Sequence, residues 1–156
     1  RARRRCSSSA RGEAVEKLRQ LVSSPDRRIA QLASAQLWRT AVASADSRQL
    51  DSWAETIELM PEGLRAGPLY VLGMAQLQNK QWECAALSLL RVAIVYRQDR
   101  SLAAQSLLEA ARGLEQASQS AEAARLYHEL LREYPEQARA AAEAQSRLEE
   151  LRQSLR

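Results

Sequence analysis

The chain repeats itself in register, and this feature constrains its fold more than any other. The nine residues 29–37 return in similar form as residues 69–77, a spacing of 40 positions. An aromatic residue also stands eight positions before a proline twice: Trp53 before Pro61, and Tyr127 before Pro135. Weak repeats of this length are typical of stacked helical arrays, in which each unit buries its apolar face against its neighbours. Such arrays usually present a binding surface.

The composition predicts a single all-α domain. The 156 residues are 46% hydrophobic and 27% charged, which is ordinary for a globular protein. Alanine, leucine and arginine are the commonest residues, glutamate and glutamine are frequent, phenylalanine is absent, and only five glycines and four prolines occur. These are helix formers with little strand chemistry among them. Arginine far outnumbers lysine, which favours a GC-rich, bacterial genome.

The positive charge is concentrated at the N-terminus. Arg1, Arg3, Arg4 and Arg5 account for the whole net charge of +4, so the rest of the chain is electrically balanced. Residues 1–12 are basic and serine-rich, and we expect them to form a disordered tail ahead of a helical domain at 13–156. The balanced domain lacks the basic stripe that nucleic-acid binding needs. Nucleic-acid or anionic-surface binding through the tail, or the flank of an upstream membrane segment, stays open as an alternative.

Apolar periodicity and turn residues divide the domain into three helical hairpins at about 26–61, 67–97 and 101–135. A helix at about 13–23 precedes them, and a capping helix at 136–155 follows. The capping helix carries apolar residues three and four positions apart: Ala141, Ala144, Leu148, Leu151 and Leu155. This stripe favours a solubilising cap, with a coiled-coil seam as the alternative.

The middle hairpin has two further signals. Its second helix, at 81–96, is apolar on almost all sides, which predicts that neighbours cover several of its faces. Cys84 in this helix is expected to be a small buried hydrophobe, and two cysteines make no disulfide framework. Gly73 and Ala85 are expected at a close crossing of the two helices.

These residues resemble the tetratricopeptide repeat, a helix–turn–helix unit of about 34 residues. The middle unit fits best, with Leu72-Gly73, Trp82, Ala85 and Leu89 at family positions. The third unit supplies Ala110-Ala111, Ala123, Tyr127, Leu130 and Pro135. The first unit has Leu32-Ala33, Trp53 and Pro61, but Gln49 stands where alanine is expected and its turn is longer. The resemblance covers about residues 26–137 and implies an α-α superhelix of about three hairpins; other paired-helix repeats share the pattern.

In that family the first helix of each unit lines a concave groove that receives a partner's peptide or helix. The resemblance implies these groove residues here: Arg27, Ser34, Leu37, Trp38, Tyr70, Met74, Leu77, Gln78, Gln105, Leu108, Arg112 and Glu115. The alternative for Leu37, Trp38 and Met74 is that they only pack against adjacent helices. A clamp for a terminal carboxylate is not expected, because the matching positions hold Ala30, Ser34, Val71, Gln105 and Glu109.

No pattern in the sequence points to catalysis, a metal or a cofactor. The single histidine, His128, is expected on the outer side of an amphipathic helix, without a second ligand near it in sequence. Phosphate-cradling and nucleophile motifs are absent, and Glu149 and Glu150 resemble a solvated helix face. We therefore expect neither an enzyme nor a cofactor.

The sequence thus favours a non-catalytic protein-interaction scaffold that binds a peptide or helix of unknown identity. The first alternative is a structural or oligomerisation module of a larger, membrane-anchored bacterial protein, acting through residues 11–23 or 136–156. Binding through the arginine tail is the second. The compartment stays open, with the cytoplasm or the cytoplasmic face of a membrane favoured.

Overall fold

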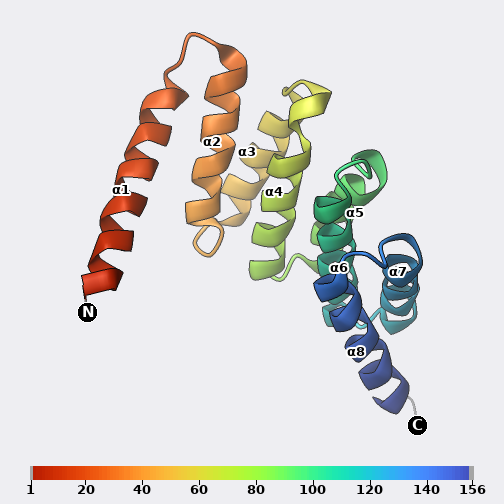
Figure 1. Cartoon of the computed structure of the whole chain (residues 1–156). Helices are drawn as coiled ribbons and strands as arrows, with labels where there is room; N and C mark the ends of the chain where they lie inside the picture. The colour runs from red at the N-terminus through yellow and green to blue at the C-terminus, as the bar shows by residue number, and fades with distance from the viewer. Residues whose placement is uncertain (1, 155–156) are drawn as a thin grey trace.

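The computed structural model describes the backbone of residues 2–154 and the side chains of residues 10–153. In this part of the chain all regular elements are helical and no strand occurs, which confirms the expected all-α fold. The elements are α1 (Ala2–Val22), α2 (Arg27–Ala41), α3 (Ser47–Glu58), a short 3-10 helix η1 (Glu62–Leu64), α4 (Ala66–Gln78), α5 (Trp82–Val95), α6 (Arg100–Gln116), α7 (Ser120–Glu133) and α8 (Ala138–Ser154). The described helices follow one another from one end of the molecule to the other, with the N- and C-terminal helices at opposite ends (Figure 1).

The first helix, α1, is longer than the sequence predicted. It begins at Ala2, so residues 2–12 are helical where a disordered tail was expected, and Arg1 lies outside the described residues. Alanine and arginine are strong helix formers, and here they extend a helix that packs on α2. That packing is shallow, because Leu21 and Val22 stay 45% and 38% exposed. The side chains of the arginine cluster lie outside the described residues, so binding through the tail stays a prediction.

The pair α2 and α3 is spaced by aromatic side chains. Asp26 caps α2, and Asp46 caps α3 in a capping box with Gln49. Trp38 of α2 stacks on Trp53 of α3 with 4.9 Å between the ring centroids. Two indole rings between the helices keep their backbones further apart than those of the later pairs. The first unit therefore has no need for a small residue at position 49.

The pair α4 and α5 packs closely because Gly73 has no side chain. A Cβ atom on Gly73 would lie only 2.6 Å from Cγ of Leu89, which is fully buried. The close crossing expected at Gly73 is present, but the side chain that fills it is Leu89, one turn beyond Ala85. The tight turn between the helices has Lys80 in the left-handed region, with φ of 60°.

The buried side chains form two cores, one at each half of the array. The first lies under α3, α4 and α5 and contains Leu50, Trp53, Ile57, Leu72, Val92 and Tyr96. The second lies under α6, α7 and α8 and contains Leu107, Tyr127, Leu130, Ala144 and Leu148. Because Ala144 and Leu148 are buried in the second core, the apolar stripe of α8 packs within the chain. The described part of α8 thus covers one side of the second core, as a capping helix would.

The outward side of α5 differs from the sequence prediction. Leu87 and Ile94 are 67% and 66% exposed, and Cys84 is exposed rather than buried. The expectation that neighbours cover this helix on several faces is therefore wrong at these positions. The reason is geometric: α4 and α6 pack against one side of α5, and no described element crosses its opposite side.

Candidate functional site

The helices α2, α4, α6 and α8 form one face of the molecule, which we call the first-helix face. Each of them contacts the next in this series, while α3, α5 and α7 are set behind them (Figure 1). This is where the family resemblance places the groove residues.

The first-helix face is hollowed between α6 and α8, and we call this depression the α6–α8 hollow. Its volume is about 430 Å³. The helix α6 contributes Ser101, Ala104, Gln105, Leu108, Glu109 and Arg112 to its lining. The segment entering α8 contributes Glu136, Gln137, Ala138, Arg139, Ala140 and Glu143. Charged and amide side chains thus surround a small apolar floor.

Arg112 is the central charge of the α6–α8 hollow. Its guanidinium donates to Glu109 at 2.8 Å on its own helix and to the carboxylate of Glu143 on α8. Burial disfavours the charge of Arg112, but its hydrogen bond to Glu109 and the charges of both carboxylates raise its pKa above the usual value. Arg112 therefore stays cationic and joins α6 to α8 across the hollow.

Tyr70 brings α4 into the same neighbourhood. It is half-buried, and its pKa is raised first by burial and then by the charge of Glu109 on α6. The positive charges of Arg39 on α2 and Arg112 on α6 act on the phenol in the opposite sense. Side chains from α2, α4 and α6 therefore lie within electrostatic reach of one another on the first-helix face.

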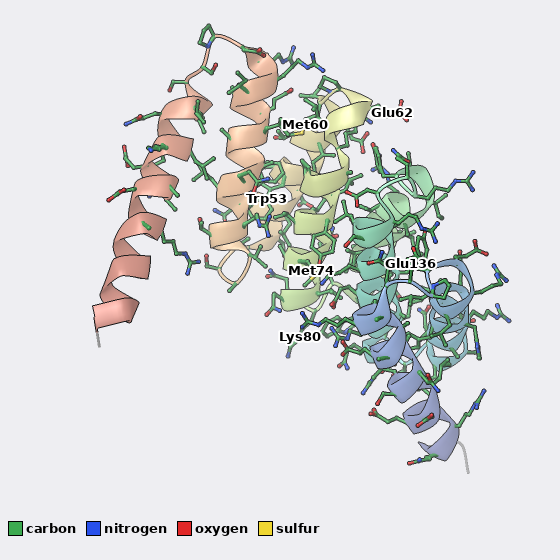
Figure 2. All side chains as sticks on the ribbon, viewed as in Figure 1. Trp53, Met60, Glu62, Met74, Lys80 and Glu136 are labelled. Carbon is green, nitrogen blue, oxygen red and sulfur yellow. The ribbon has the colours of Figure 1, made fainter. Side chains whose placement is uncertain are left out.

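The structure divides the twelve predicted groove residues into groups. Gln105, Leu108 and Arg112 line the α6–α8 hollow, although Leu108 is itself buried. Tyr70 and Met74 are half-buried on α4, Gln78 is exposed at its end, and Ser34 and Leu37 are half-buried on α2. Figure 2 shows Met74 towards the lower end of α4, and Trp53 set back between α2 and α4.

Four of the predicted residues have other surroundings. Trp38 is stacked on Trp53, so its ring serves packing between α2 and α3. Leu77 lies against Gly113, where a Cβ atom would come within 2.9 Å of its Cδ2. Arg27 lies with Glu58 and Arg65 at a second depression near the end of α3, away from the hollow. Glu115 is engaged in an ion pair within the protein, described next.

The Glu115 carboxylate is buried and bound to Arg147 of α8. The side chain of Glu115 is only 6% exposed, and Arg147 donates to both of its oxygens. The Tyr127 hydroxyl is buried beside this pair, without a hydrogen bond of good geometry. Burial and the neighbouring carboxylate raise the pKa of Tyr127, and Glu115 likewise raises that of Arg147. The Arg147–Glu115 pair fastens α8 to α6, beside Tyr127 of α7, and offers little to a partner.

Three acidic residues of the α6–α8 hollow, Glu109, Glu136 and Glu143, were not among the predicted site residues. Glu109 appeared only as a mismatch to a carboxylate clamp, and Glu136 and Glu143 were assigned to a capping helix. A sequence signal for Glu143 existed: it directly precedes Ala144 in the apolar stripe, so it stands at the edge of the helix face that packs inward. Of the ion-pair cluster of Arg112, Glu109 and Glu143, only Arg112 was a predicted site residue; the other two were identified from the tertiary structure.

The entrance to α8 is held by a second ion pair. Arg100 donates to Glu136 at 2.6 Å and to the backbone oxygen of Glu133, and its guanidinium lies 4.9 Å from the ring centroid of Tyr134. The hydrogen bond from Arg100 is the largest effect that lowers the pKa of Glu136, to about 2. A hydrogen bond from a backbone amide is the next largest. The pair connects the start of α6 to the segment that forms one wall of the hollow.

The described part of the chain has no cluster of three or more His, Cys, Asp or Glu side chains able to hold a metal ion. Among the described helices, none combines the length and hydropathy needed to cross a bilayer. Comparison of the chain with family models, curated proteins and solved structures finds no match.

Proposed function

We propose that the chain is a tetratricopeptide-like α-α superhelix that binds a peptide or helix of a partner protein along its first-helix face. The observation that carries this proposal is the run of accessible, chemically mixed side chains across α4 and α6, ending in the α6–α8 hollow. Tyr70 and Met74 supply aromatic and flexible apolar contact, and Gln105 and Arg112 supply polar contact. Such mixtures suit protein recognition, in which a few anchors contribute most of the affinity.

The charges of the α6–α8 hollow favour recognition over chemistry. Arg112 is already engaged by Glu109 and Glu143, so its charge is paired before any partner arrives. A partner group that exchanges with Glu143, whose side chain is 35% exposed, gains a charge-assisted hydrogen bond and releases that carboxylate towards solvent. We therefore propose a non-catalytic role, with a peptide that places a polar side chain at Arg112 and an apolar one at Tyr70 and Met74.

The test is a selection of binders from a random peptide library displayed on phage. Selected peptides are then measured by fluorescence anisotropy against the unchanged chain, a Tyr70→Ala/Met74→Ala variant and an Arg125→Ala control. Arg125 is exposed on α7, away from the first-helix face. We expect the double variant to bind at least about ten times more weakly, a loss of about 1.4 kcal/mol, and the control to bind as before. Weakened binding in the control alone would place the site on the opposite face.

A second candidate function is self-association through α1. The carrying observation is the exposed pair Leu21 and Val22 beside α2, where Ile29 is also 43% exposed. The described part of α8 offers no such surface, because its apolar residues are packed in the second core. Loss of concentration-dependent mass in a Leu21→Glu/Val22→Glu variant would favour this candidate.

A further inference from the structure

The helix α2 gives the first-helix face an excess of positive charge. It contains three arginines, Arg27, Arg28 and Arg39, and no acidic residue. All three are exposed, and none makes an ion pair with another described residue. On α6, by contrast, every charged residue is in an ion pair. Of the charged side chains that line the α6–α8 hollow, only that of Arg139 is likewise unpaired among the described residues. The unpaired charge of this face is therefore positive and is greatest on α2.

The carboxylates beside the start of α2 already have other partners. Asp26 accepts a hydrogen bond from the backbone N–H of Arg28 at 2.8 Å, as the cap of α2. Glu58 lines the second depression, of about 330 Å³, and accepts from Arg65 at 3.1 Å and from Arg91 at 2.6 Å. These two carboxylates stand against Arg65, Arg91 and the two arginines at the start of α2, so the surroundings of the depression stay positive. A carboxylate from a ligand would meet available guanidinium groups there.

Arg39 brings the positive charge of α2 towards α4. Its charge acts on the phenol of Tyr70, where it opposes the rise in pKa that burial and Glu109 cause. Neither Arg39 nor Tyr70 makes a side-chain hydrogen bond to another described residue. A partner carboxylate over this part of the face would therefore meet a guanidinium and a hydroxyl that are both free to donate.

The helix α4 itself carries no charge. None of its residues from Ala66 to Gln78 is acidic or basic, and Tyr70 and Met74 are half-buried on it. A nucleic acid has a phosphate at every nucleotide, so its backbone would cross this helix without a pairing cation and would then meet Glu109 of the hollow. A peptide can combine acidic residues in one part with apolar residues in the next. The charge pattern of the face therefore favours a peptide over a nucleic acid.

The helices behind the first-helix face have the opposite charge balance. Together α3, α5 and α7 contain seven acidic residues and four arginines, whereas α2, α4, α6 and α8 contain five acidic residues and eight arginines. An acidic peptide is therefore attracted to the first-helix face and repelled from the opposite side of the molecule.

We propose that the partner peptide of the first-helix face is acidic, with a run of carboxylate side chains along α2 and an apolar part over α4. The inference rests on the proposed peptide binding and adds the chemistry of the partner. Arg27 and Arg39 are about 18 Å apart along the helix axis, a distance that about five extended residues span. The acidic part is therefore a run of residues, with Arg27, Arg28 and Arg39 as its partners and Tyr70 and Met74 beyond it.

The first measurement compares the peptides that a random phage library yields against the parent chain and against an Arg27→Glu/Arg28→Glu/Arg39→Glu variant. We expect acidic runs to be enriched on the parent and basic runs on the variant. Selected peptides that depend on Tyr70 and Met74 but contain no acidic run would overturn the acidic partner and leave the proposed peptide binding standing. Selected peptides that do not depend on Tyr70 and Met74 would refute both.

The second measurement is the affinity of the selected acidic peptides, from fluorescence anisotropy. The α2 variant should bind them at least about ten times more weakly, with an unchanged helical circular dichroism spectrum. The matched control reverses three exposed and unpaired arginines outside the four helices of the face, and so changes the net charge equally: Arg48→Glu/Arg97→Glu/Arg125→Glu. The control should bind like the parent. Equal weakening in both variants would show that only the net charge matters, and would overturn the proposal.

A fluorescein-labelled single-stranded DNA of similar length is the probe for the rival partner. We expect the parent chain to bind it more weakly than the acidic peptides at about 0.15 M salt, where unspecific surface attraction is screened. DNA that binds more tightly than every selected peptide, and is lost in the α2 variant, would replace the peptide by a nucleic acid and overturn the proposal.

Discussion

The substitution Gly73→Ala tests the closest contact between two helices in the array. The added Cβ atom would lie 2.6, 2.9 and 3.3 Å from three carbons of Leu89, whereas ordinary contacts begin near 3.4 Å. The nearest of the three is Cγ, the branch point of the side chain, so a rotation of the methyl groups cannot relieve the overlap. Leu89 is fully buried, and α4 and α5 must therefore separate.

The magnitude follows from two opposing terms. Overpacking of a filled core costs about 1–3 kcal/mol, and three overlapping atoms on a fully buried side chain point to the upper part of that range. Alanine gains back about 1 kcal/mol over glycine inside a helix. We expect Gly73→Ala to lower the free energy of unfolding by about 2 kcal/mol, taking the upper overpacking figure less the helix gain.

The assay is urea denaturation followed by far-UV circular dichroism, which should show a helix-dominated spectrum for each variant. The control is Gly12→Ala in α1, where a Cβ atom meets nothing within 4 Å, and stability should be unchanged or slightly higher. In a double-mutant cycle, Leu89→Ala should be less harmful in the Gly73→Ala background than alone, by about 1–2 kcal/mol. A Gly73→Ala protein as stable as the parent would refute the account of this crossing.

Three further perturbations have defined outcomes. Arg147→Gln should lower stability to urea by about 2–3 kcal/mol, because the buried Glu115 loses its partner, whereas Arg152→Gln on the exposed side of α8 should change little. The pKa of Glu136 is lowered from 4.5 to about 2, so the stabilisation from its pair with Arg100 should be complete above the unfolded value and lost as the pH falls from about 4.5 to about 2. The melting temperature of a Glu136→Gln variant should not show this part of the pH dependence. If the melting temperatures of the variant and the parent fall identically in acid, the ion pair does not stabilise the fold. Deletion of residues 1–10 should leave the melting temperature nearly unchanged, since residues 11–14 of α1 are exposed, and a large drop would show that the basic end is part of the packed structure.

The sequence was most informative where packing follows local pattern. The helix pairs at about 26–61, 67–97 and 101–135 and the exposed position of His128 were predicted, since each depends on apolar periodicity and turn residues within a short stretch of the chain. Gly73 was predicted to be a packing position, but its contact with Leu89 was not predicted. Helix periodicity does not determine the register between two packed helices to within one turn.

Predictions about coverage by other helices were less accurate. The apolar residues on both sides of α5 indicated burial, yet Leu87 and Ile94 point away from every described helix. Periodicity shows which faces of a helix are apolar, and cannot show whether another element is present to cover them. The same limit applies to Glu143, whose position on α8 gave no indication of an ion pair with Arg112 on α6.

The most direct test of the first-helix face as the binding surface is hydrogen–deuterium exchange of the chain with and without a selected peptide. The account predicts slower exchange in α4, in α6 and in the first turns of α8, which surround Tyr70, Arg112 and Glu143. Exchange in α3 and α7 should be unaltered. Protection confined to α3, α5 and α7, with none in α4 or α6, would contradict the central claim.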